Sequence, residues 1–496
     1  MSMDLDTKQE ERAEGAAMAR RDVVKGAAAA PVAVPVGAAT QSPRTKLVED
    51  GKERADLEKY RALGGWVEKP DDMQPALEGD VSADVVIAGA GFAGLSAALE
   101  LARQGAKVVV IEREFPGFGA SGRNAGYLAG AMALEYDLML KGISKERATQ
   151  IVRFYDDAVG FVEGRLKEHD IDCEYLQTGW IRAGVHPAQE KKIRKDMQFG
   201  AECGHESEFL DQAQMRARGI PSAFLFGEYT PIGGTLHPGK YVMGLRRAAL
   251  RAGVKLYENT PLLSYTEGRV VQVTTPRGSV SAPVLIFATN AYTPQLGLLA
   301  KKVVPLRISA IETEPLSKEQ LASLGWPRRE GIVTGHWSME SFRLTARNTI
   351  ISTVKRIHYP YGSETPNVPA YDQYRELRMG LHERLPILKD VALRHCWSGY
   401  ISSAGDALPV VGTTGANQNI YYTAGCSGHG VASQSMVGHM IAQQIGGTEP
   451  PLLTALHHDT PSLPHEPFRW CLINGMLVAA NALDDRVNRK VRGVAI

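Results

Sequence analysis

Residues 84–94 of the chain read Asp84-Val85-Val86-Ile87-Ala88-Gly89-Ala90-Gly91-Phe92-Ala93-Gly94. The first half is a short apolar run of the kind that forms a buried parallel strand, and the second half is a glycine-rich turn. A helical pattern follows at residues 95–104, and a second apolar run follows at residues 107–111. This order of strand, glycine turn, helix and strand predicts a dinucleotide-binding unit.

Each glycine of the turn has its own predicted role. Gly89 permits the tight turn, Gly91 lets the backbone approach a pyrophosphate, and Gly94 allows close packing of the helix on the strand. Glu112 lies 18 residues after Gly94, where a carboxylate accepts hydrogen bonds from ribose hydroxyls. The other residues predicted to contact the cofactor here are Phe92, Ala93 and Arg113.

A second glycine-rich stretch, residues 118–126, follows Glu112 closely and reads Phe-Gly-Ala-Ser-Gly-Arg-Asn-Ala-Gly. Small residues with a hydroxyl, a guanidinium and an amide suit a loop laid against a flat, polar-edged ring, and a flavin is such a ring. The alternative is an ordinary glycine loop. The predicted cofactor contacts in this loop are Gly119, Ala120, Ser121, Gly122, Arg123, Asn124, Ala125 and Gly126.

A third stretch, residues 425–431, leads into a helical pattern at residues 432–445. The positive end of that helix is expected to face the pyrimidine edge of a flavin, which is negative when reduced. The predicted contacts are Gly425, Ser427, Gly428, His429, Gly430 and Val431. The first and third glycine-rich segments lie about 300 residues apart, and together they can hold one extended cofactor from both ends. This arrangement favours FAD over NAD.

The composition sets limits on the function. A chain of 496 residues with 44% hydrophobic residues can bury a large core, and its formal charge of +1 gives no case for nucleic acid. The five cysteines have no metal-ligand spacing, so we expect unpaired, mostly buried thiols and no metal site. No apolar run reaches the roughly 20 residues that span a bilayer. The apolar run at residues 471–482 predicts a helix packed on the protein, with a membrane-surface helix as the alternative.

The first eighty residues differ in composition from the rest. Arg20-Arg21-Asp22-Val23-Val24-Lys25 and the Ala-rich stretch after it resemble a twin-arginine export signal, which predicts a periplasmic protein. The alternative is a disordered Ala/Pro-rich tail on a cytoplasmic protein. Residues 1–40 are therefore assigned to this leader, and residues 41–80 to a linker or surface wrap held down by Tyr60, Leu63 and Trp66.

Taken together, these motifs resemble the D-amino-acid oxidase-like superfamily of FAD-dependent oxidoreductases, and within it the gamma-glutamylputrescine oxidoreductase group. The resemblance covers about residues 80–490, including the tail at residues 464–485. Further segments that carry it are Ile171-Asp172-Cys173-Glu174-Tyr175, Thr178-Gly179, Gly233-Gly234-Thr235-Leu236-His237-Pro238, Ala288-Thr289-Asn290-Ala291-Tyr292, Phe342-Arg343-Leu344-Thr345 and Trp397-Ser398-Gly399.

The resemblance implies an α/β fold of two lobes: a Rossmann-like FAD-binding domain and an α+β substrate domain whose antiparallel sheet roofs the flavin. It further implies a backbone contact of Leu262 with adenine, a contact of Thr289 with FAD, and non-covalent FAD. The FAD domain is assigned to residues 81–130, 235–300 and 395–447, the substrate domain to residues 131–234 and 301–394, and a C-terminal segment to residues 448–496.

The expected chemistry is oxidation of a carbon–nitrogen bond. A hydride passes from the carbon that bears nitrogen to flavin N5, the imine hydrolyses to an oxo product and ammonia, and O2 is the expected acceptor, giving H2O2. Arg343 is the candidate partner of a substrate carboxylate, with a structural arginine as the alternative. The positive charge of Lys355 and Arg356 favours a substrate with a carboxylate, and His237 is a candidate orienting residue. The remaining candidates for substrate contact are His336, Trp397 and Tyr400, with core packing as their alternative.

The residues favour an oxidase of an amino acid, with an L-amino acid as the preferred substrate. A gamma-glutamylputrescine or amine oxidoreductase of polyamine catabolism is an alternative. A quinone-linked amino-acid dehydrogenase and a non-catalytic flavoprotein are two others. The expected partners are a small amine or amino acid and O2, with peripheral membrane contact and a homo-oligomer left open.

Overall fold

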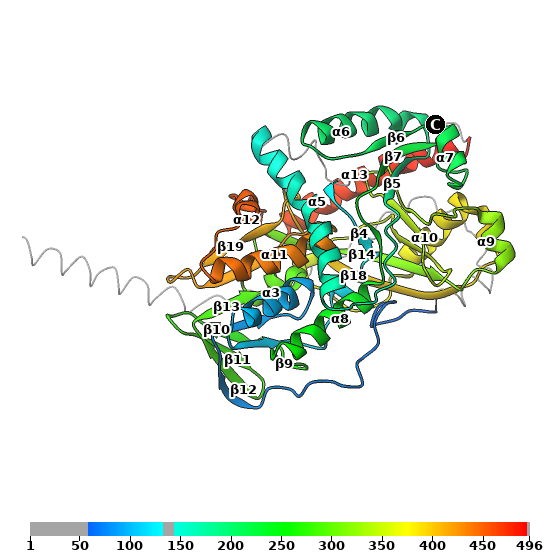
Figure 1. The fold of residues 1–496 in the computed structure, drawn as a ribbon. Coiled ribbons are helices and arrows are strands. Elements are labelled where there is room, and N and C mark those ends of the chain that lie inside the picture. Colours follow the sequence, from blue (N-terminus) through cyan, green and yellow to red (C-terminus); the bar gives the residue numbers. More distant parts are fainter. Residues whose placement is uncertain (1–57, 132–142, 494–496) are drawn as a thin grey trace, which may run out of the picture. The chain divides into compact units, whose positions relative to one another are not determined.

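The computed structural model describes residues 58–131 and 143–493. The predicted leader and the first part of the predicted linker, up to residue 57, lie outside the described residues. All statements below refer to the described ranges, whose elements are labelled in Figure 1.

A six-stranded sheet carries the glycine turn. Its strand order is β19-β20-β13-β2-β3-β9, and β2 pairs in parallel with both β3 and β13. The four-residue strands β2 and β3 are buried along their whole length, as their unbroken Val/Ile composition predicts. The strands are β2 (Val85–Ala88), β3 (Val108–Ile111), β9 (Lys255–Tyr257), β13 (Val284–Phe287), β19 (Val410–Thr414) and β20 (Ile420–Ala424).

Successive side chains of a strand point to opposite faces of a sheet. In this sheet the two faces are covered by different elements. Val85 and Ile87 share a core with helices on one face, whereas Val86 and Ala88 share a core with a small sheet on the other. The helices on the first face are α3 (Phe92–Arg103), α5 (Lys145–Glu168), α8 (Pro238–Arg251), α11 (Gly430–Ile445) and α12 (Pro451–Leu456). The small sheet is β1 (Gly79–Ser82), β12 (Gly278–Ala282), β11 (Val271–Thr275) and β10 (Ser264–Thr266).

An eight-stranded sheet forms the second lobe, with strand order β18-β14-β17-β16-β15-β5-β7-β6. It is antiparallel except for the pair β15–β5. Its strands are β5 (Trp180–Gly184), β6 (Glu208–Leu210), β7 (Phe226–Thr230), β14 (Val303–Thr313), β15 (Gly331–Thr334), β16 (Glu340–Leu344), β17 (Ile350–Val354) and β18 (Leu393–Ala404). The predicted two-lobed α/β fold with a sheet over the site is confirmed.

Helices cover the side of this sheet that faces away from the first lobe. The core there joins side chains of β15 to β17 to those of α10 and its neighbours. The helices of this lobe are α6 (Glu190–Glu202), α7 (Gln212–Ala217), α9 (Lys318–Leu324), α10 (Tyr371–Arg384) and α13 (Phe468–Val491). A two-stranded ribbon, β4 (Tyr127–Leu128) with β8 (Gly234–Thr235), links the lobes, and single 3-10 turns occupy Ala120–Gly122, Pro187–Gln189, Asn290–Leu296, Tyr361–Ser363 and Pro386–Leu388.

The described part of the predicted linker packs against the rest of the protein. The backbone around Tyr60 pairs with Cys396 on β18, and Trp66 is buried against Trp397. The five cysteines are free; four are buried and Cys471 is exposed. In the described ranges no group of side chains is arranged to hold a metal ion, and no helix has the length and apolarity to cross a membrane.

Candidate functional site

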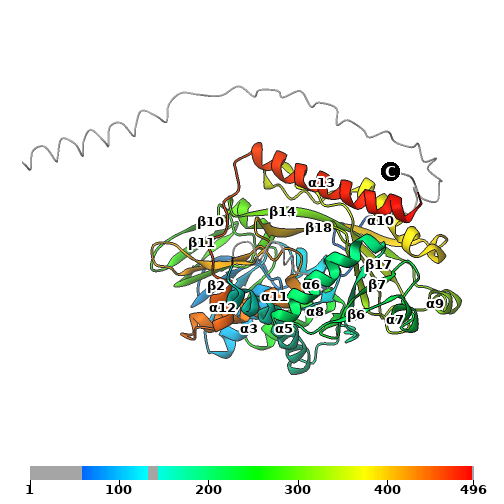
Figure 2. The ribbon, with the colours of Figure 1, turned by 90° about the horizontal axis from the view of Figure 1, so that it is seen from above.

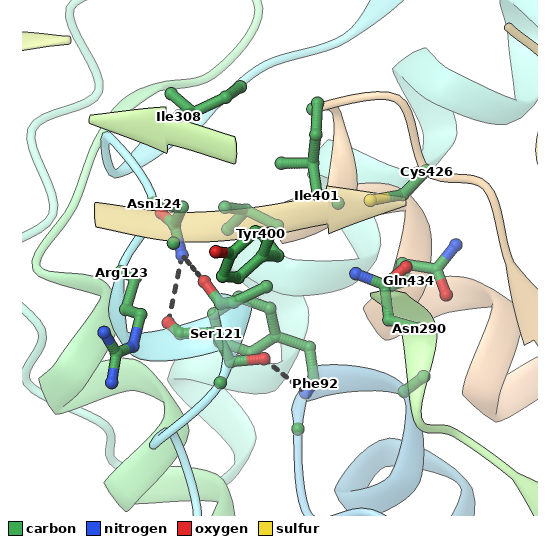
Figure 3. Close-up of a pocket in the computed structure, with 18 of the residues that line it drawn as sticks. Phe92, Ser121, Arg123, Asn124, Asn290, Ile308, Tyr400, Ile401, Cys426 and Gln434 are labelled. Atoms are coloured by element: carbon green, nitrogen blue, oxygen red, sulfur yellow. Dashed lines mark hydrogen bonds between the residues drawn. The ribbon is translucent and has the colours of Figure 1, made fainter. Parts of the chain in front are cut away.

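A cavity of about 380 Å³ lies between the two lobes. Its floor comes from the three glycine-rich segments, and its roof comes from the eight-stranded sheet (Figure 3). The predicted cofactor residues that line it are Gly89, Gly91, Phe92, Ala93, Glu112, Arg113, Gly119, Ala120, Ser121, Arg123, Asn124, Ala125, Leu262, Thr289, Ser427, Gly428, His429, Gly430 and Val431.

The turn between β2 and α3 is closed so tightly that side chains are excluded from it. Gly89 adopts a φ of 102°, in the region that favours glycine. A Cβ at Gly94 would lie 1.9 Å from the Gly89 carbonyl oxygen, and a Cβ at Gly91 would lie 2.9 Å from Ser121 Oγ. Backbone and N–H groups therefore form the surface of the turn, as a pyrophosphate-binding turn requires.

The charge of Glu112 is held by backbone donors. Its Oε2 accepts a hydrogen bond from Ala90 N at 2.8 Å, and its Oε1 accepts one from Glu114 N at 3.1 Å. Burial raises the pKa of this carboxyl, and the two N–H donors oppose that shift. Each oxygen keeps a second lone pair for a ribose hydroxyl, so the geometry fits the predicted role.

The loop at residues 118–126 is shaped by its own side chains. Asn124 Nδ2 donates to Ala120 O and Ser121 O, at 3.1 and 3.0 Å, while Asn124 Oδ1 accepts from Gly126 N at 2.8 Å. Ser121 Oγ accepts the hydrogen bond of Phe92 N at 3.1 Å, which joins the loop to the start of α3 (Figure 3). The loop is thus fixed before any ligand binds.

Four residues predicted to contact the cofactor do not line the cavity, so their contact with FAD stays a prediction. Gly94, Gly122, Gly126 and Gly425 each meet neighbouring protein atoms where a side chain would stand. A Cβ at Gly122 would be 2.2 Å from Gly117 O, and one at Gly126 would be 1.9 Å from Arg343 Nη1. These glycines bring chain segments together around the cavity.

The guanidinium of Arg123 is also committed to the protein. Nε donates to Phe118 O at 2.7 Å, Nη1 to Ser398 O at 2.9 Å and Nη2 to Ala62 O at 2.5 Å. In Figure 3 it points away from the other labelled side chains. Arg123 therefore joins the loop, β18 and the chain before β1, and only its carbon stem reaches the cavity.

The opposite end of the floor holds polar atoms that have no protein partner. α11 begins at Gly430, and no side chain caps its first turn. Beside it, Asn290 Oδ1 and Gln434 Nε2 are buried without a hydrogen bond, and Cys426 lies next to them (Figure 3). Buried polar atoms need partners, and the polar rim of an isoalloxazine ring supplies both donors and acceptors. The donor set therefore fits FAD; Asn290 and Gln434 were not among the predicted contacts.

The roof of the cavity carries no charge in the described residues. Its side chains are apolar, aromatic or hydroxyl groups, and the charged residues that line the cavity, Glu112, Arg113 and Arg123, belong to the floor. Of the predicted substrate contacts, only Tyr400 lies here. The roof residues are Tyr127, Ala129, Trp180, Ile308, Ser309, Ala310, Val333, Trp337, Met339, Ser341, Thr353, Val354, Ile357, Gly399, Tyr400 and Ile401.

Both phenols of the roof are un-ionised and bonded to backbone. Tyr400 Oη donates to Pro366 O at 2.9 Å, and burial raises the pKa of Tyr400 to about 12. Tyr127 Oη lies 2.8 Å from Phe342 O and 3.0 Å from Ile332 O, and burial also raises its pKa. Neither side chain is a base near neutral pH.

Arg343, the candidate partner of a substrate carboxylate, is bonded to the protein backbone in this structure. Its Nη1 donates to Ala125 O, Gly126 O and Leu236 O, at 2.9, 2.7 and 2.6 Å, and its guanidinium stacks on the Trp66 ring. Arg343 is buried and does not line the cavity. Its contact with a substrate carboxylate therefore stays a prediction.

Two more predicted contacts lie outside the cavity. Trp397 is fully buried, and its Nε1 donates to Arg123 O at 2.9 Å. His336 Nδ1 bonds to Thr334 Oγ1 at 2.7 Å, and its ring lines a separate small pocket of about 40 Å³. Burial lowers the pKa of His336, against the pull of the nearby Glu340 and Asp484 carboxylates.

The cations at residues 355 and 356 are paired with protein carboxylates. Lys355 Nζ lies 2.7 Å from Glu340 Oε1, and Arg356 Nη2 lies 2.9 Å from Asp485 Oδ1. Neither lines the cavity, so their charge gives no reason to expect a substrate carboxylate. His237 caps α8, because its Nδ1 accepts a hydrogen bond from Lys240 N at 3.1 Å. Like Lys355 and Arg356, it does not line the cavity.

Fold and site together define a flavoprotein of two lobes, with a nucleotide-binding floor and a sheet for a roof. The family model for FAD-dependent oxidoreductases, DAO, matches residues 84–444. The chain belongs to this family and depends on FAD. Its homologues act as amine and amino-acid oxidoreductases, and the chain is an enzyme of that kind.

Individual proteins agree with the family. The chain is 29% identical to gamma-glutamylputrescine oxidoreductase of Escherichia coli, over 79% of this chain and 89% of that protein. It is 30% identical to the probable oxidoreductase OrdL of Rhizobium meliloti, over 77% and 88% of the two chains. Among solved structures, glycine oxidase from Geobacillus kaustophilus matches with a TM-score of 0.65 and 18% identity, over 75% of this chain and 96% of that one, which shows a shared fold.

Proposed function

We propose that this enzyme oxidises a carbon–nitrogen bond in an amine that carries no carboxylate on the reacting carbon. The observation behind this proposal is the uncharged roof: the described residues over the flavin end of the cavity include no Arg, Lys or His. Burying a carboxylate without a cation or several donors is costly. The sequence favoured an amino acid because of the positive charges of Arg343, Lys355 and Arg356, and none of these three residues lines the cavity.

The roof residues prepare the substrate for oxidation. Bound FAD supplies the hydride acceptor of this chemistry. Trp180, Met339 and Val354 exclude water from the amine, which favours its neutral form, because a buried ammonium ion loses its hydration. The hydroxyls of Ser341 and Thr353, 2.6 Å apart, are the polar groups of the roof that can orient the nitrogen. No roof residue is a base, so the substrate has to lose its proton on entry.

An α-amino acid is the second candidate substrate. It is favoured by relatives rather than by the cavity: the chain is 25% identical to glycine oxidase of Bacillus licheniformis and 22% identical to a D-amino-acid oxidase of Bradyrhizobium diazoefficiens. Gamma-glutamylputrescine oxidoreductase, by contrast, is named for an amine with no carboxylate on its reacting end. Substrates that differ only in this carboxylate distinguish the candidates.

The experiment is anaerobic bleaching of the flavin absorbance with matched pairs. Phenethylamine is compared with L- and D-phenylalanine, and putrescine and its gamma-glutamyl derivative are compared with ornithine. We expect the amines to reduce the flavin at least tenfold faster than the amino acids of the same pair. Faster reduction by the amino acids would contradict the proposal and would place a carboxylate partner outside the roof described here.

Two exposed aromatic residues provide a matched pair of variants. Trp337 is 56% exposed and lines the cavity, whereas Tyr361 is 57% exposed and does not. Trp337→Ala is expected to raise KM for the best amine several-fold, and Tyr361→Ala to leave it unchanged. Equal effects of the two changes would show that the cavity does not bind the substrate.

Three further features belong to the same proposal. Reoxidation by O2 predicts one H2O2 per amine oxidised under air. Non-covalent FAD predicts that acid precipitation releases all the yellow colour, despite Cys426 at the cavity. Export through the twin-arginine route, read from residues 20–25, predicts that Arg20→Lys/Arg21→Lys retains the protein in the cytoplasm.

A further inference from the structure

Helix α13 packs on the protein with its polar face. Asp484 accepts hydrogen bonds from Trp337 N and Ser338 N, both at 2.8 Å, and Asn474 Nδ2 donates to Tyr359 O at 3.1 Å. Its fully buried side chains are Arg469, Asp484 and Asn488. An ordinary surface helix buries its apolar side chains. In α13 the most deeply buried side chains are polar, while Ile473, Leu477 and Val487 are only half-buried.

Many apolar side chains of α13 are nevertheless exposed to solvent. Phe468 is 72% exposed, Met476 64% and Val478 67%, and Leu472 and Leu483 are about half exposed. Between residues 468 and 483 the exposed positions carry no charge. In Figure 2 the helix lies along one side of the second lobe, beyond β14 and α10. We call this surface the outer face of α13; its residues are Phe468, Cys471, Leu472, Gly475, Met476, Val478, Ala479, Ala482 and Leu483.

A cluster of cations follows directly after the outer face. Arg486, Arg489 and Lys490 are exposed on the same helix and make no ion pair with a described residue. The two acids of the helix do not offset them, because Asp484 is buried and Asp485 pairs with Arg356. The unpaired exposed charges of this helix are therefore positive.

These charges argue against a second copy of the chain as the occupant of the outer face. A parallel pair of α13 helices would bring the two cation clusters together without an acid between them. An antiparallel pair would set each cluster against the apolar Phe468–Leu472 end of the partner helix. Both arrangements place like charges or unpaired charges in an interface, which is unfavourable.

We propose that the outer face of α13 binds the surface of an anionic lipid membrane, with the helix lying in the plane of the interface. Apolar side chains enter the boundary of the acyl chains, and adjacent Arg and Lys side chains pair with anionic headgroups; this is the usual design of in-plane membrane helices. The absence of a spanning helix in the described ranges agrees with surface binding rather than insertion across the bilayer.

The contacts of Asp484 bring this membrane surface close to the cavity. Asp484 holds the backbone of Trp337, and the side chain of Trp337 lines both the cavity and the small pocket beside it. The roof of the site is thus anchored on the helix that would meet the lipid.

The test is flotation of the full-length, FAD-loaded protein with vesicles of phosphatidylcholine, with or without about a third of phosphatidylglycerol. We expect binding to the anionic vesicles, and binding about tenfold weaker without phosphatidylglycerol or in high salt. Leu472→Glu/Met476→Glu should weaken binding at least tenfold. Arg489→Glu/Lys490→Glu should remove the preference for anionic lipid.

Matched controls use residues far from α13. Val270→Glu places the same charge on an exposed apolar residue of the β10–β11 turn, and Lys255→Glu reverses an exposed charge on β9. Both should bind like the unchanged protein, and retained flavin absorbance reports that every variant is folded. The proposal is overturned if the unchanged protein does not float with anionic vesicles, or if the α13 variants bind as well as the controls. It is also overturned if light scattering shows a dimer that Leu472→Glu/Met476→Glu converts to monomers.

Discussion

The floor and the roof of the cavity are built in opposite ways. The floor consists of backbone: glycines at Gly89 and Gly91, helix starts, and charged groups such as Glu112 whose partners are nearby in the chain. The roof consists of side chains that arrive from β5, β14, β16, β17 and β18. A cofactor that is the same in all relatives suits a backbone surface, whereas a substrate that differs among them suits replaceable side chains. The comparison predicts that the turn between β2 and α3 tolerates no added atom and that the roof tolerates many.

The strongest test of the comparison is a single methyl group in the floor. Gly94→Ala places a Cβ 1.9 Å from Gly89 O, so the helix has to move away from the strand. We expect loss of bound FAD and of most soluble protein, measured as the flavin-to-protein absorbance ratio. The control is Gly160→Ala on α5, where a Cβ meets no atom within 4 Å. It should keep full flavin and gain about 0.5–1 kcal/mol of stability.

A large effect is also expected where the floor and the roof meet, at Arg343. Arg343→Ala leaves three backbone carbonyls without their donor, which should lower the free energy of unfolding by about 3 kcal/mol or more. The preference for amine over amino acid should not change, because the guanidinium does not face the cavity. Urea unfolding and the ratio of kcat/KM values within a matched substrate pair measure the two effects. A selective loss of amino-acid oxidation would restore Arg343 as a substrate contact.

The uncharged roof predicts a pH profile governed by the substrate. Tyr400 has a pKa of about 12 and the described roof residues offer no other base, so we expect the ammonium ion to lose its proton before it binds. kcat/KM should therefore rise about tenfold per pH unit below the pKa of the free amine. Profiles of two amines of different pKa should be displaced by that difference. A common inflection for both amines would indicate that a group of the enzyme acts as the base. The roof would then not differ from the charged floor in lacking a titratable group.

His237 gives an effect on stability that is absent at neutral pH and appears only in acid. Burial and the charges of Arg347 and Arg343 lower its pKa to about 3, and the neutral ring accepts a hydrogen bond from Lys240 N. The unfolded chain binds this proton near pH 6.5 and the folded chain does not. Stability is therefore complete above pH 6.5 and falls by up to about 1.4 kcal/mol per pH unit between pH 6.5 and 3. His237→Asn keeps a cap and should flatten this part of the curve in thermal unfolding measured against pH.

The smallest effect is expected in the roof itself. Tyr400→Phe removes one hydrogen bond to Pro366 O and leaves the ring in place. The loss of stability should be about 1 kcal/mol, and KM should change no more than a few-fold. Flavin content should stay complete. Loss of FAD from this variant would show that the roof, like the floor, determines cofactor binding.

The sequence by itself determined the floor. Gly89, Gly91, Gly94 and Glu112 lie within one strand–turn–helix–strand unit, so their spacing fixes their geometry without reference to the rest of the chain. That unit and the other two glycine segments predicted FAD, whereas the family and the two-lobed fold were implied by a resemblance that extends over about residues 80–490. The free, buried cysteines were predicted from spacing alone, with Cys471 as the exposed exception.

Only the tertiary structure decided which roof residues face the substrate. Ser341 and Arg343 lie on the same face of β16, because side chains of a strand repeat every second residue. The loop that ends at Gly126 covers Arg343 and leaves Ser341 open to the cavity, and that loop comes from more than 200 residues earlier in the chain. For the same reason, the sequence did not show that α13 packs on the protein through buried polar side chains. An apolar run in a sequence shows that a helix has an apolar face, whereas the partners of Asp484 and Asn488, supplied by distant segments, decide which face turns inward.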